Sequence, residues 1–212
     1  MMVTAFVGGS ITSIVMHAST TSTASTIVVP ATVQAGDIMV LFDRPISGGL
    51  PAAVVPAGWS AGNQSGTGNF RMFVSYKLAV NADAGATVTG MAGSLSNAKM
   101  MYVFRPDIPA LVLTPGSIVS SVVVSPSVAD PTVTTLAGSA TAPLVVIGAY
   151  SRNGAVSPRT MSPAKDGEIN ASTSAYLAYK IYNSSPANVT VTTPGNTSVQ
   201  SAQAMYLVPT LV

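Results

Sequence analysis

The chain resembles itself at an offset of about 104 residues, and this internal repeat constrains its fold more than any other feature. Four short motifs recur in the same order, with small drifts in offset that changes in loop length would produce: Ser-Ile-Val at 13–15 and 117–119, Tyr-Lys-Leu at 76–78 and Tyr-Lys-Ile at 179–181, Thr-Val-Thr at 87–89 and 190–192, and Met-Tyr-Val at 101–103 and Met-Tyr-Leu at 205–207. The pattern predicts one β-rich unit written twice, at about residues 11–106 and 115–209.

The composition of the chain is typical of an all-β protein. Its 15 prolines and 18 glycines interrupt the sequence at short intervals, and Val, Ile, Thr and Tyr fill the segments between them. Short β-prone segments separated by turn residues indicate a sandwich or a barrel. We therefore expect an all-β fold with almost no helix, a jelly-roll-like antiparallel β-sandwich built from two pseudo-repeats.

Two alternating segments predict which side chains face the core. In residues 70–80, Val74 and Tyr76 point to one side, whereas Phe73 and Lys77 point to the other. Residues 175–182 alternate in the same way. The core side is expected to carry Ala175, Leu177, Tyr179 and Ile181. The outer side is expected to carry Tyr176, Ala178, Lys180 and Tyr182. The runs at 37–42 and 144–147 are almost continuously apolar, which predicts central strands covered on both faces.

The stretch between the two repeats, residues 108–131, indicates how the halves are joined. It is rich in Val and Pro and contains strand-like segments at 111–113 and 118–124. Because this composition does not suit a flexible linker, we expect residues 1–212 to form a single β-sandwich unit; two separable sandwiches are the alternative. Connections rich in Gly, Pro and Ser occupy the same place in each repeat, at 43–69 and 151–172, and are expected to be binding loops.

The low charge of the chain indicates that its surface is partly covered by other proteins. Only 8% of its residues are charged, against roughly a quarter in an average domain, whereas 48% are hydrophobic. We expect a homo-oligomer, because apolar surface of this extent is hidden most readily between subunits. The nine cationic residues are scattered, which disfavours nucleic-acid binding. No apolar run is long enough to predict a membrane span.

The residues that carry most enzyme chemistry are scarce. His17 is the only histidine, and no Gly-x-Ser-x-Gly motif supplies a nucleophile for it. Glu168 is the only glutamate, which disfavours a glycosidase carboxylate pair. Asp166, Glu168 and Asn170 alternate as calcium ligands can, but a solvated hairpin explains this short cluster better. We therefore expect no enzymatic activity, no metal site and no cofactor.

Aromatic and lysine side chains predict a contact surface instead. Trp59, the sole tryptophan, lies in a Gly- and Ser-rich connection, where it either stacks on a sugar ring or folds back to close one end of the sandwich. On the outer strand faces, aromatic rings lie beside lysine stems, a combination that another surface usually covers. The candidate interface and binding residues are Trp59, Phe73, Lys77, Tyr176, Lys180 and Tyr182.

A series of short motifs resembles a pattern found in small phage and prophage structural proteins. The motifs are Gly-Asp-Ile-Met-Val-Leu-Phe at 36–42, Pro-x-Gly-Trp at 56–59, Tyr-Lys-Leu-Ala at 76–79 and Val-Phe-Arg at 103–105. Pro106 stands where that pattern usually has glycine. The resemblance covers most of the chain, and it implies a structural protein with no catalytic residues to carry over.

The resemblance also implies where such a protein acts. It points to the virion surface, where the chain is expected to serve as an outer-capsid cement or decoration protein that contacts copies of itself and the major capsid protein. The alternative is a tail or fibre component, an adhesin that binds glycans of the host surface through the loop that carries Trp59.

Overall fold

A computed structural model describes residues 13–44, 54–65, 72–91, 98–107, 111–114, 123–125, 132–136, 144–152, 160–162, 164–172, 175–182, 188–192 and 200–211. The regular structure of the described residues is β-strand, apart from a three-residue 3₁₀ turn, η2 (Asn81–Asp83). This confirms the predicted all-β class. The strands of the first half are β1 (Ile14–Ser22), β2 (Ile27–Val28), β3 (Ile38–Arg44), β4 (Ser60–Ser65), β5 (Met72–Leu78), β6 (Thr87–Val88) and β7 (Ala98–Pro106). Those of the second half are β8 (Leu111–Thr114), β9 (Val123–Ser125), β10 (Thr132–Leu136), β11 (Leu144–Arg152), β12 (Thr160–Ser162), β13 (Gly167–Ser172), β14 (Ala175–Tyr182), β15 (Asn188–Thr192) and β16 (Gln200–Leu211).

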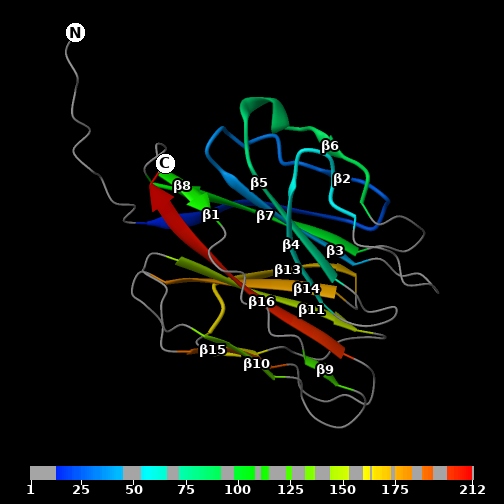
Figure 1. Ribbon diagram of the computed structural model, residues 1–212, viewed down its shortest axis with the longest axis vertical. Helices are drawn as coiled ribbons and strands as arrows, with labels where there is room; N and C mark the ends of the chain where they lie inside the picture. Colours follow the sequence, from blue (N-terminus) through cyan, green and yellow to red (C-terminus); the bar gives the residue numbers. More distant parts are fainter. Residues whose placement is uncertain are drawn as a thin grey trace.

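These strands form two large antiparallel sheets and two small ones. The first large sheet has the order β1-β7-β3-β5-β4, and the second has the order β13-β14-β11-β16-β8, with β9 also pairing with β16. The small sheets are β2-β6 in the first half and β10-β15-β12 in the second. In Figure 1 they lie in layers: β2 and β6 cover the first large sheet, the second large sheet packs beneath it, and β10 and β15 lie on the far side.

The side chains on the two faces of the first large sheet pack into two separate hydrophobic clusters. The inner cluster, between the large sheets, joins Val40 and Phe42 of β3 to Leu177 of β14. The outer cluster lies under β2 and β6 and includes Met39 and Leu41. Because β3 contributes to both clusters and every one of its residues is buried, it is the central, doubly covered strand that its apolar sequence predicted.

Tyr102 ties the two large sheets together at the centre of the inner cluster. Its side chain is fully buried, and its hydroxyl donates a hydrogen bond to the Leu177 carbonyl oxygen at 2.7 Å. Its ring lies 5.1 Å from that of Tyr179 and 5.7 Å from that of Phe104, in edge-on and tilted arrangements that aromatic rings favour. Burial is the main cause that raises the pKa of Tyr102 and of Tyr179.

Two of the predicted outer aromatics are not available at the surface. Phe73 lies opposite Asp43, on the side predicted for it, but it is only 3% exposed because this side of the sheet faces the outer cluster. Tyr182 was also predicted to face outward and is buried, at 8% exposed. Alternation gave the correct side of β5; the expectation of exposure was wrong because small sheets lie on the outer sides of both large ones.

The predicted connections are partly strands. The segment at 43–69 contains β4, and the segment at 151–172 contains β12 and β13. β4 and β13 pair with the strands that follow them, and each lies at one end of its sheet order. Of the predicted strand at 118–124, only its C-terminal part falls within β9, and the remainder lies outside the described residues. The jelly-roll connectivity and the one-unit domain assignment stay predictions.

Candidate functional site

A tight turn directs Trp59 back onto the outer side of the first sheet. The Trp59 amide donates to the Pro56 carbonyl oxygen at 3.0 Å, and Gly58 adopts a φ of +78°, which favours glycine because it has no Cβ. The indole packs against the outer cluster and is half-buried. Of the two arrangements open for Trp59, this is the folded-back one, although it covers a sheet face instead of an end of the sandwich.

Lys77 meets Trp59 at the same place from strand β5. Its ammonium group donates to Asp83 Oδ1 at 2.6 Å, and the other oxygen of that carboxylate accepts the Val80 amide at 2.9 Å. Asp83 is therefore fixed at the end of the 3₁₀ turn, and it holds the lysine beside the indole. Both side chains of the ion pair are partly exposed, so the pair remains accessible from solvent.

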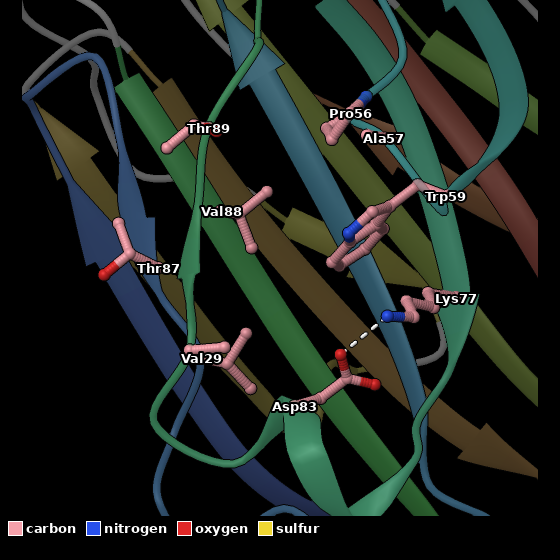
Figure 2. Close-up of a pocket in the computed structure, with 10 residues that line it drawn as sticks. Val29, Pro56, Ala57, Trp59, Lys77, Asp83, Thr87, Val88 and Thr89 are labelled. Atoms are coloured by element: carbon pink, nitrogen blue, oxygen red, sulfur yellow. Dashed lines mark hydrogen bonds and ion pairs between the residues drawn. The ribbon is translucent and has the colours of Figure 1, made fainter.

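Trp59, Lys77 and Asp83 border a cavity of about 150 Å³. Figure 2 shows the Pro56–Trp59 turn on one side and the segment at 87–89 on the other, with the dashed ion pair at one end. The lining residues are Val29, Pro56, Ala57, Trp59, Lys77, Asp83, Ala86, Thr87, Val88 and Thr89. An indole and two valines beside an ammonium and a carboxylate suit a small amphipathic group, such as one sugar ring or one side chain of a partner.

The candidate residues of the second half lie on a different surface from Trp59 and Lys77. Lys180 of β14 donates to Asp166 at 2.5 Å, and the same carboxylate accepts the Ile181 amide. Tyr176, also on β14, is half-buried. Because the outer sides of the two large sheets face opposite ends of the layered molecule, these residues do not join Trp59 and Lys77 in one patch (Figure 1).

The predicted oxygen cluster in the second half is engaged in ion pairs. Lys165 donates to Glu168 at 2.5 Å, and Asp166 binds Lys180. Among the described residues, no group of three or more histidine, cysteine, aspartate or glutamate side chains could hold a metal ion. His17 contacts the Thr32 carbonyl oxygen through Nε2 at 3.0 Å, a structural contact at strand β1.

Sequence reasoning missed two ion pairs that hold the first half together. Arg105 donates from Nε and Nη2 to the two oxygens of Asp37, at 2.6 and 2.7 Å, and this hydrogen bonding raises the pKa of Arg105. Lys99 donates to Asp43 at 2.9 Å, and both side chains are buried. Neighbouring Arg44 is also buried, and the resulting desolvation lowers its pKa to about 10.

The Asp37–Arg105 ion pair explains what two of the sequence motifs do in the fold. Asp37 follows Gly36 and accepts a hydrogen bond from the Gln34 amide at 2.9 Å, which closes the turn before β3. Arg105 lies near the end of β7, which runs antiparallel to β3. The Gly-Asp and Phe-Arg motifs therefore meet at one end of a strand pair, where they fix its register.

A comparison with protein-family models, curated proteins and solved structures finds no match to this chain. Within the described ranges, no helix is long and apolar enough to cross a membrane.

Proposed function

We propose that this chain is a non-enzymatic structural protein of a bacteriophage virion, acting on the outer capsid as a cement or decoration protein. The motif resemblance suggests the class of protein. The surface chemistry of the described residues supports a role in which neighbouring proteins cover the chain.

The observation that carries the proposal is how the charges are used. The chain has sixteen charged residues, nine basic and seven acidic, and in the part that the structure describes ten of them take part in five ion pairs. Charges that are satisfied internally contribute less to the repulsion that keeps protein surfaces apart. This favours close packing against copies of the chain and against other proteins.

Exposed aliphatic side chains add to this surface. Six large ones are between 37% and 52% exposed, and they lie on β1, on β2, before the Trp59 turn and at the end of β5: Val15, Val28, Val54, Val55, Leu78 and Val80. Single exposed aliphatic residues are common on proteins. In a chain with so few charged residues, however, they give neighbouring subunits apolar area to bury.

The proposed mechanism is mechanical. The two stacked sheets form a rigid body, because a continuous core joins them. Placed across a junction between capsid subunits, such a body resists their separation through many small contacts that add up over the interface. The partners are the chain itself, as a homo-oligomer such as a trimer, and the major capsid protein.

The test compares phage particles that contain the chain with particles that lack it. We expect the deficient particles to release their genome at a lower temperature and to be rescued by adding the purified chain. Particles of equal resistance with and without the chain would contradict the cementing role.

A tail or fibre adhesin is the second candidate, and the cavity beside Trp59 favours it. An aromatic face next to a lysine–aspartate pair is a combination that binds sugars. On this alternative the chain binds host glycans on an array, and Trp59→Ala abolishes binding while Val15→Ala, an exposed valine away from the cavity, does not. Absence of any glycan signal for the native chain counts against the adhesin.

A further inference from the structure

The small sheet of the first half, β2-β6, has one described strand fewer than the small sheet of the second half, β10-β15-β12. The difference lies beside β6 and β15, two strands that share a sequence motif. In the second half, β15 pairs with β10 on one side and with β12 on the other. In the first half, β6 pairs with β2, and no other described strand joins it. Both edges carry Thr-Val-Thr, at 87–89 and at 190–192. Among the described residues of the first half, no strand corresponds to β12.

Strand register locates the place of the missing strand. Tyr76 pairs with Ser60, and the corresponding Tyr179 pairs with Gly167, so these two pairs align the halves. β12 ends immediately before Pro163, and the aligned proline of the first half is Pro56. The residues before Pro56, Val54 and Val55, are exposed and form no strand.

The backbone of β6 presents its second edge for pairing. The Val29 amide donates to the Ala86 carbonyl oxygen at 2.9 Å, which makes Val28 and Thr87 a non-hydrogen-bonded pair of the antiparallel ladder. In such a pair the amide and carbonyl of Thr87 point away from β2, and alternation directs those of Thr89 the same way. The cavity lies between this segment and the Pro56–Trp59 turn (Figure 2).

We propose that this edge accepts an extended strand of a partner protein, by addition to the β2-β6 sheet. The partner's backbone pairs with Thr87 and Thr89, as β12 pairs with β15. An apolar side chain of the partner enters the cavity and packs against Trp59 and Val88. The ammonium of Lys77 lies at the end of the cavity, where it can donate to a carbonyl or carboxylate of the same strand.

The proposal goes beyond a location in the virion, because it holds whether the chain lies on the head or on the tail. It assigns the cavity to a polypeptide and not to a sugar. Open edges are normally protected in proteins that act alone, so a short edge with Thr87 and Thr89 exposed beside a side-chain pocket suits a site for one specific segment.

Hydrogen exchange tests first whether the edge is open. In the isolated protein, the amides of Thr87 and Thr89 are expected to exchange on the order of 100-fold faster than that of Val88, whose amide faces β2. Equal protection of all three amides would overturn the proposal, since it would mean that the chain already fills its own edge.

A peptide provides the second test. The probe has the sequence of residues 159–163, Arg-Thr-Met-Ser-Pro, because it contains the strand that fills the equivalent edge. Titrated at millimolar concentration into labelled protein, it is expected to shift the amide signals of Thr87 and Thr89 and the indole signal of Trp59, and to slow exchange of the two amides. The control peptide carries proline in place of the threonine, because Thr160 pairs with Thr192, the residue that corresponds to Thr89, and proline removes the backbone donor that faces this residue.

Two protein variants make the result specific to the edge. Thr89→Pro removes a backbone donor that faces the incoming strand, whereas Thr89→Val changes the side chain and keeps that donor. We expect the first variant to lose the peptide response and the second to retain it, with thermal melts confirming that both are folded. No shift in the native protein, or an equal response from both variants, refutes strand addition and leaves the proposed virion role untouched.

Discussion

Substituting Tyr102 by Phe tests whether the two large sheets pack closely enough to exclude water from the side chain of Tyr102. The hydroxyl of Tyr102 is buried and donates to the Leu177 carbonyl oxygen of the other sheet at 2.7 Å. Removing one such hydrogen bond while keeping the ring lowers the free energy of unfolding by about 1–1.5 kcal/mol near neutral pH.

The same substitution has a distinctive dependence on pH. Because burial raises the pKa of Tyr102, the folded protein retains the phenol proton at pH values where the unfolded chain loses it, above about 10. The folded state then binds more protons than the unfolded state, so the native protein loses about 1.4 kcal/mol from this one group by pH 11. Tyr102→Phe lacks this loss, and its stability should therefore meet that of the native protein near pH 11.

Urea denaturation at a series of pH values from 7 to 11 measures the difference. Ile38→Val is the matched control, because it removes one methylene from the same cluster, costs about 1 kcal/mol and carries no titratable group. Its difference from the native protein should stay constant with pH. A Tyr102→Phe difference that also stays constant would show that water reaches the phenol, which would contradict the sealed packing of the sheets.

Three further substitutions test contacts of the first half, each by chemical denaturation. Arg105→Ala leaves the carboxylate of Asp37 buried without its bidentate donor and should cost about 3 kcal/mol; Arg105→Lys should cost less, and equal losses would contradict the role of the paired bonds. Lys99→Met should destabilise by about 3–5 kcal/mol, and the double variant with Asp43→Leu should recover most of that loss, so additive losses would refute the pairing. Gly62→Ala would place a Cβ 2.8 Å from the Val74 carbonyl oxygen and should cost about 1–3 kcal/mol; an unchanged midpoint would contradict this close approach.

The sequence predicted the covered strand of the fold well because continuous apolar runs carry that information directly. The run at 37–42 corresponds to β3, which lies at the centre of its sheet with both faces covered. The run at 144–147 corresponds to the start of β11, which pairs on both sides and places Val145 and Ile147 in the inner cluster. Burial of this kind follows from side-chain chemistry alone.

The exposure of Phe73 and Tyr182 could not be predicted by the same reasoning. Alternation along a strand tells which residues share a side, but not whether another layer covers that side. For Phe73 the side faces a cluster that includes Ile27, Val88 and Met91, far away in the sequence, and their positions depend on the complete topology. The contact surface predicted from outward-pointing aromatic residues therefore includes two side chains, Phe73 and Tyr182, that are buried inside the protein.

The candidate site was predicted only in part for a similar reason. Trp59 and Lys77 were selected for their chemistry, and the structure brings them to one cavity. Asp83 and the edge at 87–89 complete that cavity through a sheet pairing between β2 and β6 that involves two residues on each strand. The internal repeat marked Thr-Val-Thr at 87–89, but a pairing this short leaves no pattern that predicts its partner strand, so its place beside Trp59 could be found only in the structure.

The most direct test of the proposed virion role is to image purified virus particles from cells that produce this chain, labelled with an antibody raised against it. We expect regularly spaced label on the outer surface of the head, at many copies per particle. Particles that carry none of the chain, although infected cells produce it, would contradict the account.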